Sequence, residues 1–172
     1  MNLLFYPIEL LKDFLYNIGN QWSACERIHI LRRLTHMIKA IMGLKGTGKT
    51  KALADLCNQA VAADHGNVVY IEKGKTLMFT INSRARLVNI EDYEISDFDA
   101  FYGFVAGLMA GNHDITEIFI DSITKICAPD LDAVEVFLNK VKKLSDIYNV
   151  NVTVTVTGDV AAASAGLKNY LG

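Results

Sequence analysis

The sequence predicts an α/β fold in three layers, in which a mainly parallel five-stranded sheet lies between two layers of helices. Three observations lead to this prediction. Short apolar, β-branched runs alternate with amphipathic stretches of helical length, a glycine-rich loop joins the first run to the next helix, and a later run ends in an aspartate. Because parallel strands need crossover connections, this alternation places helices on both faces of the sheet.

The five predicted strands are runs of apolar and β-branched residues. They cover residues 38–42, 68–71, 87–90, 118–120 and 150–157. The last run alternates Val and Thr, which is the period of two expected for a strand.

Three helices are predicted from apolar residues at helical spacing, over residues 49–65, 98–111 and 130–148. Gly66 is predicted to end the first helix. Ser96, with Asp99 three residues later, resembles a capping box at the start of the second.

The domain organisation is predicted to change near residue 36. Leu4, Ile8, Leu11 and Leu15 fall at helical spacing, so residues 1–36 are predicted to be a helical extension. The alternative is that these residues are an over-extended gene start and that translation begins at Met37, because the preceding arginines could be encoded by a ribosome-binding sequence. Residues 37–172 are predicted to form one domain.

Composition excludes several classes of function. The chain has 172 residues, of which 51% are hydrophobic and 21% charged, with a net charge of −2. This balance gives no sign of a general nucleic-acid partner, and the apolar run at residues 3–11 is too short to span a membrane. The scattered cysteines, Cys25, Cys57 and Cys127, predict buried thiols in a reducing cytoplasm rather than disulfides or a zinc site.

The loop between the first strand and the first helix reads Gly-Leu-Lys-Gly-Thr-Gly-Lys-Thr and matches the phosphate-binding pattern G-x-x-x-x-G-K-[ST] at every fixed position. Glycines let backbone N–H groups approach a phosphate closely, and the N-terminus of the following helix favours an anion. Lys49 would bring a positive charge to the β- and γ-phosphates, and the Thr50 hydroxyl would bind Mg²⁺. The predicted nucleotide-binding residues here are Gly43, Leu44, Lys45, Gly46, Thr47, Gly48, Lys49, Thr50 and Lys51.

Two acidic residues end later strands of the predicted sheet. Asp121 follows the run 118–120, and because ligands bind beyond the carboxyl ends of such strands, it is predicted to share Mg²⁺ with Thr50, directly or through water. Many ATPases place a catalytic glutamate directly after this aspartate, but Ser122 stands there. Glu72, at the end of the run 68–71, is therefore predicted to activate the attacking water; the alternative is a solvated carboxylate. Lys49, Glu72 and Asp121 are the predicted catalytic residues.

Together these segments resemble the RecA-like branch of the P-loop NTPases. The resemblance covers residues 37–158 and lies in the glycine loop, in Tyr-Ile-Glu ending at Glu72, and in Ile-Phe-Ile-Asp-Ser-Ile-Thr around Asp121. It implies a three-layer αβα P-loop NTPase fold that binds ATP and Mg²⁺. It also implies a polar nucleotide-sensing residue at Thr157, although this threonine could simply complete one face of its strand. The core is similar to small bacterial ATP-binding proteins as well.

The sequence departs from this family after Thr157. RecA-like proteins have further strands there, whereas an alanine-rich segment, 158–172, follows here, so recombinase activity is not implied. The strand 38–42 would be an exposed edge unless residues 1–36 cover it. Lys45 stands one position later than the extra loop lysine of chromosome-partitioning ATPases, which makes that comparison a minor alternative.

The predicted function is that of a cytoplasmic, Mg²⁺-dependent ATPase that hydrolyses the β–γ phosphoanhydride bond. The alternatives are a non-catalytic ATP-binding regulatory module and a small P-loop kinase. The predicted partners are the nucleotide and either another protein or a second copy of the chain, with no nucleic acid and no membrane span. Arg84 and Arg86 are candidates to complete the site of a neighbouring subunit.

Overall fold

Five strands form one sheet in the computed structural model, which describes residues 38–74 and 80–171. They are β1 (Ile38–Gly43), β2 (Asn67–Glu72), β3 (Arg86–Asn89), β4 (Ile115–Ile120) and β5 (Asn151–Thr157). The strand order is β1-β5-β4-β2-β3, and each neighbouring pair is parallel. The described sheet is thus entirely parallel, which confirms the predicted fold class. The predicted helical extension at residues 1–36 lies outside the described residues.

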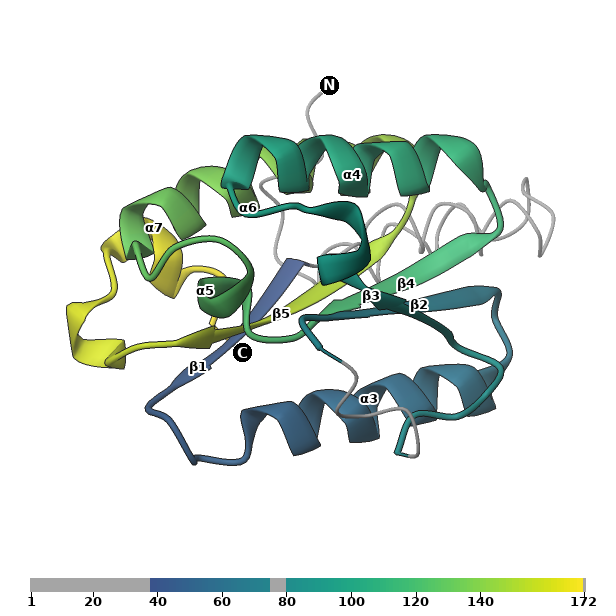
Figure 1. Cartoon of the computed structure of the whole chain (residues 1–172), viewed down its shortest axis with the longest axis horizontal. Coiled ribbons are helices and arrows are strands. Elements are labelled where there is room, and N and C mark those ends of the chain that lie inside the picture. Colours follow the sequence, from purple (N-terminus) through teal and green to yellow (C-terminus); the bar gives the residue numbers. More distant parts are fainter. Residues whose placement is uncertain (1–37, 75–79, 172) are drawn as a thin grey trace, which may run out of the picture. The chain divides into compact units, whose positions relative to one another are not determined.

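Helices cover both faces of the sheet. Helix α3 (Lys49–Ala63) lies on one face, and α4 (Phe98–Gly111) and α6 (Leu131–Tyr148) lie on the other (Figure 1). Shorter helical segments are η2 (Ile90–Tyr93), α5 (Ile123–Ile126), η3 (Val160–Ala162) and α7 (Ala165–Lys168). The described residues therefore form the predicted three-layer αβα arrangement.

The alternation of side chains along each strand divides the core between the two faces. On the α3 face, Tyr70 and Phe119 pack with Leu53 of α3. On the other face, Ile71 and Ile120 pack with the helices α4 and α6. Glu72, the last residue of β2, and Asp121, the residue after β4, therefore point to the α3 face, where the glycine loop also lies.

Two predicted helix boundaries were wrong by one or two residues. Helix α3 ends at Ala63, and its C-cap is Asp64 (φ 54°) rather than Gly66, since aspartate is one of the few side chains that tolerate this left-handed conformation. Helix α4 is capped by Asp97, whose carboxylate accepts a hydrogen bond from the Ala100 N–H at 2.8 Å, and not by Ser96.

The outer edge of β1 is partly paired by the end of the described chain. The Ala40 N–H donates to the Tyr170 carbonyl at 2.7 Å, and Ala40 and Leu171 form a parallel bridge. β1 is an edge strand of the described sheet, as expected, and the segment after α7 pairs with it at one position. Coverage by residues 1–36 lies outside the described residues. An alanine-rich segment carries no period-two pattern that could have predicted this pairing.

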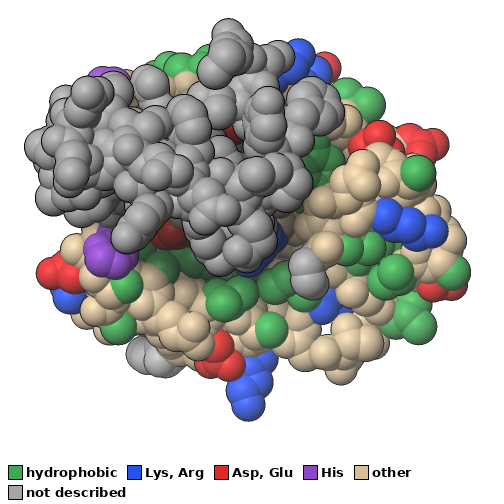
Figure 2. All heavy atoms as spheres, turned by 180° about the vertical axis from the view of Figure 1, so that it is seen from behind, with side chains coloured by type: hydrophobic (Ala, Val, Ile, Leu, Met, Phe, Trp, Pro, Cys, Tyr) green, Lys and Arg blue, Asp and Glu red, His purple; other side chains and the backbone are tan. Residues whose placement is uncertain are grey.

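On the face shown in Figure 2, the described acidic and basic side chains are interspersed. Across the described ranges, no helix has the length and apolar character needed to cross a membrane. Cys57 is buried and Cys127 half-buried, and both are free thiols. Burial raises the pKa of each thiol to about 11, so both stay protonated and unreactive at neutral pH.

Candidate phosphate-binding site

The glycine loop connects the end of β1 to the start of α3. Gly46 (φ 88°) and Gly48 (φ 82°) adopt left-handed conformations that a side chain would strain, and a Cβ atom at either would enter open space. Gly48 is also the N-cap of α3 and forms no side-chain cap. The first N–H groups of the helix are therefore left without a side-chain acceptor, which is the condition for binding an anion there.

Lys49 folds back over this loop instead of extending into solvent. Its Nζ donates to the carbonyls of Gly43 at 2.8 Å and Leu44 at 2.7 Å, and more weakly to the Thr47 hydroxyl at 3.4 Å. Burial lowers the pKa of Lys49; the negative charge of Asp121 opposes this shift, and the positive charge of Lys125 adds to it. The ammonium group is thus held at the loop in a position where a bound anion would stabilise its charge.

Asp121 lies directly beneath the start of α3. The Thr50 hydroxyl donates to its two carboxylate oxygens at 3.0 and 3.1 Å. The buried Thr155 hydroxyl donates to Asp121 Oδ1 at 2.7 Å and itself accepts from the Ser122 N–H at 2.6 Å. The predicted Thr50–Asp121 pair is therefore in contact, and Thr155 adds a second hydrogen bond that the sequence analysis did not anticipate.

Glu72 is the last residue of β2, and Asp121 follows the last residue of the neighbouring strand β4. Ile71 of β2 pairs with Ile120 of β4, and the Asp121 N–H donates to the Ile71 carbonyl at 2.8 Å. Glu72 is only 2% exposed, so it is not the solvated carboxylate considered as the alternative. Both carboxylates belong to the sheet face that α3 covers.

Tyr70, two residues before Glu72, brings a third polar group to this region. Its side chain is fully buried, and among the described residues its hydroxyl has no hydrogen-bond partner. Burial raises its pKa far above the usual range, and the negative charges of Asp121 and Glu72 raise it further. The hydroxyl is therefore neutral, and Tyr70 lies on the same face of the sheet as both carboxylates.

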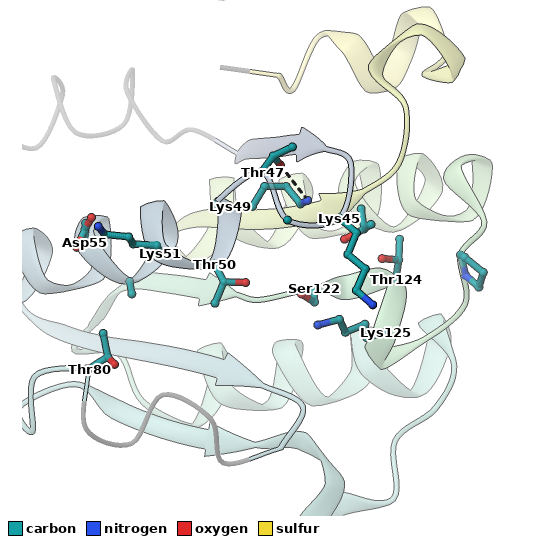
Figure 3. A pocket seen from close by; sticks show the side chains of 15 residues that line it. Lys45, Thr47, Lys49, Thr50, Lys51, Asp55, Thr80, Ser122, Thr124 and Lys125 are labelled. Carbon is teal, nitrogen blue, oxygen red and sulfur yellow. Dashed lines mark hydrogen bonds between the residues drawn. The ribbon is translucent and has the colours of Figure 1, made fainter.

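A cavity of about 770 Å³ opens beside the loop (Figure 3). Its volume is within the range of small-molecule sites. The described residues that line it are Lys45, Gly46, Thr47, Gly48, Lys49, Thr50, Lys51, Ala54, Asp55, Thr80, Ser122, Thr124, Lys125, Pro129 and Thr157. Most of the predicted nucleotide-binding residues therefore share one cavity.

Four of the predicted site residues that the structure describes do not line the cavity: Gly43, Leu44, Glu72 and Asp121. Gly43 and Leu44 instead accept the hydrogen bonds from Lys49. Thr157 belongs to the wall and pairs with Gly43 at the ends of β5 and β1.

The two arginines lie elsewhere in the described structure. Arg84 forms an ion pair with Asp64, the C-cap of α3, and Arg86 begins β3. Because α3 has 15 residues, Asp64 is roughly 20 Å from the loop. Arg84 therefore does not serve its own cavity, and a role in a neighbouring copy stays a prediction.

Sequence reasoning missed Thr155 and Lys125. Thr155 has the same parity as Thr157 in β5, so the alternation of the strand had already placed it on the Asp121 face. Lys125 stands four residues after Asp121, in a segment for which the sequence predicted no structure.

Comparison with known proteins supports the fold and adds no residue-level detail. The sequence matches no protein-family model and no curated protein. Its structure is similar to that of the flagellar accessory protein FlaH from Methanocaldococcus jannaschii, with a TM-score of 0.51 and 16% sequence identity. The match covers 78% of this chain and 66% of FlaH, so the chain spans slightly less than two thirds of that protein. The fold is thus an αβα sandwich of the RecA-like type.

Proposed function

We propose that this chain binds ATP with Mg²⁺ and hydrolyses the β–γ phosphoanhydride bond. The observation that carries the proposal is the contact between Thr50 and Asp121 at the cavity next to the glycine loop. The loop lysine and the adjacent Thr50 hydroxyl converge there with a carboxylate that lies 71 residues further along the chain. A glycine-rich turn without a ligand would not need this convergence.

The donor atoms fit Mg²⁺ in type and spacing. This ion prefers hard oxygen ligands in an octahedron with bonds of 2.0–2.1 Å, so adjacent ligand oxygens lie about 2.8–3.0 Å apart. The Thr50 hydroxyl and the nearer Asp121 oxygen are 3.0 Å apart. Thr50 and Asp121 would hold the ion, which would neutralise phosphate charge when bound. Lys49 and the N–H groups from Gly46 to Thr50 would bind the phosphates.

Glu72 is the proposed base that orients or deprotonates the attacking water. Its position at the end of β2, beside the end of β4 that Asp121 follows, supports this role. Thr157, at the cavity wall, is the proposed contact that reports the state of the nucleotide. A second copy of the chain or another protein is the proposed partner.

The test is to measure Mg²⁺-ATP binding and phosphate release in parallel for the wild type, Lys49→Ala and Glu72→Gln. Lys49→Ala should weaken ATP binding by about tenfold or more, since it removes a charge-assisted contact. Glu72→Gln should keep binding and lose at least about 100-fold in phosphate release. Glu91→Gln, which neutralises an exposed carboxylate in η2, is the matched control.

Three outcomes separate the parts of this proposal. A wild-type protein that does not bind ATP would refute it entirely. ATP binding without phosphate release would assign a regulatory module in place of an ATPase. Release that persists in Glu72→Gln would refute the role of Glu72 alone.

A further inference from the structure

The wall of the cavity carries more positive charge than the loop motif accounts for. Four lysines line it, Lys45, Lys49, Lys51 and Lys125, against one carboxylate, Asp55. In Figure 3 the Lys51 side chain lies near Asp55 along α3, whereas Lys125 reaches in from α5. Three of these lysines belong to the loop and the first turn of α3, and Lys125 comes from a different element.

The backbone after β4 is built in a way that directs Lys125 into the cavity. Ser122 takes a left-handed conformation (φ 54°), which is costly for a residue with a side chain, and its N–H is held by the Thr155 hydroxyl. The Lys125 N–H then donates to the Ser122 carbonyl at 2.7 Å, and Lys73 Nζ donates to the Lys125 carbonyl at 2.9 Å. This short turn is therefore anchored to both β5 and the end of β2.

Lys125 and Lys49 carry the same charge and line the same cavity. Two ammonium groups in one cavity repel each other, which destabilises the site when no anion is bound. An anion between them attracts both groups and stabilises the site. The described arginines do not supply a cation to this wall, because Arg84 pairs with Asp64 and Arg86 begins β3.

We propose that Lys125 is a second phosphate-contacting cation of this cavity and that it binds the terminal phosphate of ATP from the side opposite the glycine loop. The proposal rests on the ATP-binding function proposed above. The loop N–H groups and Lys49 hold the phosphates at the start of α3, and Lys125 approaches from the turn that follows Asp121. Lys125 thus supplies, within the same chain, a charge that an arginine from a neighbouring subunit supplies in related sites.

The test compares Mg²⁺-ATP with Mg²⁺-ADP, because the two differ by the phosphate that Lys125 is proposed to contact. Calorimetric titrations on the full chain would use the wild type, Lys125→Gln, Lys125→Arg and Lys143→Gln. Lys143 is an exposed lysine of α6, so its variant is the matched control for loss of one charge. We expect Lys125→Gln to weaken ATP binding about tenfold or more and ADP binding less than about twofold.

Lys125→Arg should recover most of the ATP affinity, because a guanidinium group also pairs with phosphate, and Lys143→Gln should bind like the wild type. Equal losses for ATP and ADP in Lys125→Gln, or no loss for either, would overturn the assignment of Lys125 while leaving ATP binding by the wild type intact. A wild-type chain that binds neither nucleotide would overturn the proposed function and this inference with it.

Discussion

Replacing Tyr70 with phenylalanine should stabilise this protein. The Tyr70 side chain is fully buried, and its hydroxyl has no hydrogen-bond partner among the described residues. A buried polar group without a partner costs about 1–3 kcal/mol relative to its hydrated state in the unfolded chain. Tyr70→Phe removes that cost and leaves a void the size of one oxygen atom, which costs a few tenths of a kcal/mol at about 24 cal/mol per Å³. We therefore expect a net gain of about 1–2 kcal/mol in the free energy of unfolding.

Urea unfolding followed by circular dichroism would measure this gain, which should also raise Tm by roughly 2–4 °C per kcal/mol. Tyr170→Phe is the matched control, since the Tyr170 hydroxyl donates to Asn139 Oδ1 at 2.6 Å. That variant loses a hydrogen bond and should be destabilised by about 0.5–1.5 kcal/mol. If Tyr70→Phe is destabilised as much as Tyr170→Phe, the Tyr70 hydroxyl has a partner, such as a water bridging to Asp121, and the reasoning is refuted.

Two further substitutions test the polar groups of the sheet by urea unfolding. Thr155→Val should lower the free energy of unfolding by about 2–4 kcal/mol, because it leaves the buried Ser122 N–H without an acceptor and removes a hydrogen bond to Asp121. The control Thr153→Val, on the same face, should change the free energy of unfolding little. Equal losses in the two variants would contradict this account. Burial raises the pKa of Glu117 above its value in the unfolded chain. The ionised carboxylate therefore lowers the stability of the folded protein at pH values above the folded pKa, and this loss of stability disappears as the pH falls through that pKa. Glu117→Gln should therefore stabilise the protein at pH 7 and give no gain near pH 3, and a gain that persists at low pH would refute the charge argument.

The sequence was sufficient for the elements whose signal is local. The glycine loop specified a turn from β1 into α3, and the Val/Thr alternation specified β5 and its two faces. Asp121 could be paired with Thr50 because strands of a parallel sheet present their carboxyl ends at one edge. These predictions needed only the order of the elements and the direction of the strands.

The sequence was insufficient where the register between strands decides the contact. Thr155 and Thr157 have the same parity in β5, so alternation alone cannot tell which one lies beside Asp121. The pairing of Ile120 with Val154 settles this, because the next residue on each strand is then Asp121 and Thr155. Lys125 depends in the same way on the left-handed turn at Ser122, which a side-chain-bearing residue adopts only under tertiary constraint.

The two side chains that donate hydrogen bonds to Asp121 belong to different parts of the fold. Thr50 belongs to α3, and a cation bound by a lone pair of the Thr50 oxygen, as proposed, would leave its O–H able to donate to the carboxylate. Thr155 lies in β5, outside the loop, and its hydroxyl is itself oriented by the Ser122 N–H. The carboxylate is therefore held by hydrogen bonds from two separate elements, and contacts of this kind hold a metal ligand in place. Asp121 is thus oriented by the sheet without a ligand, which would lower the cost of ordering the proposed nucleotide site on binding.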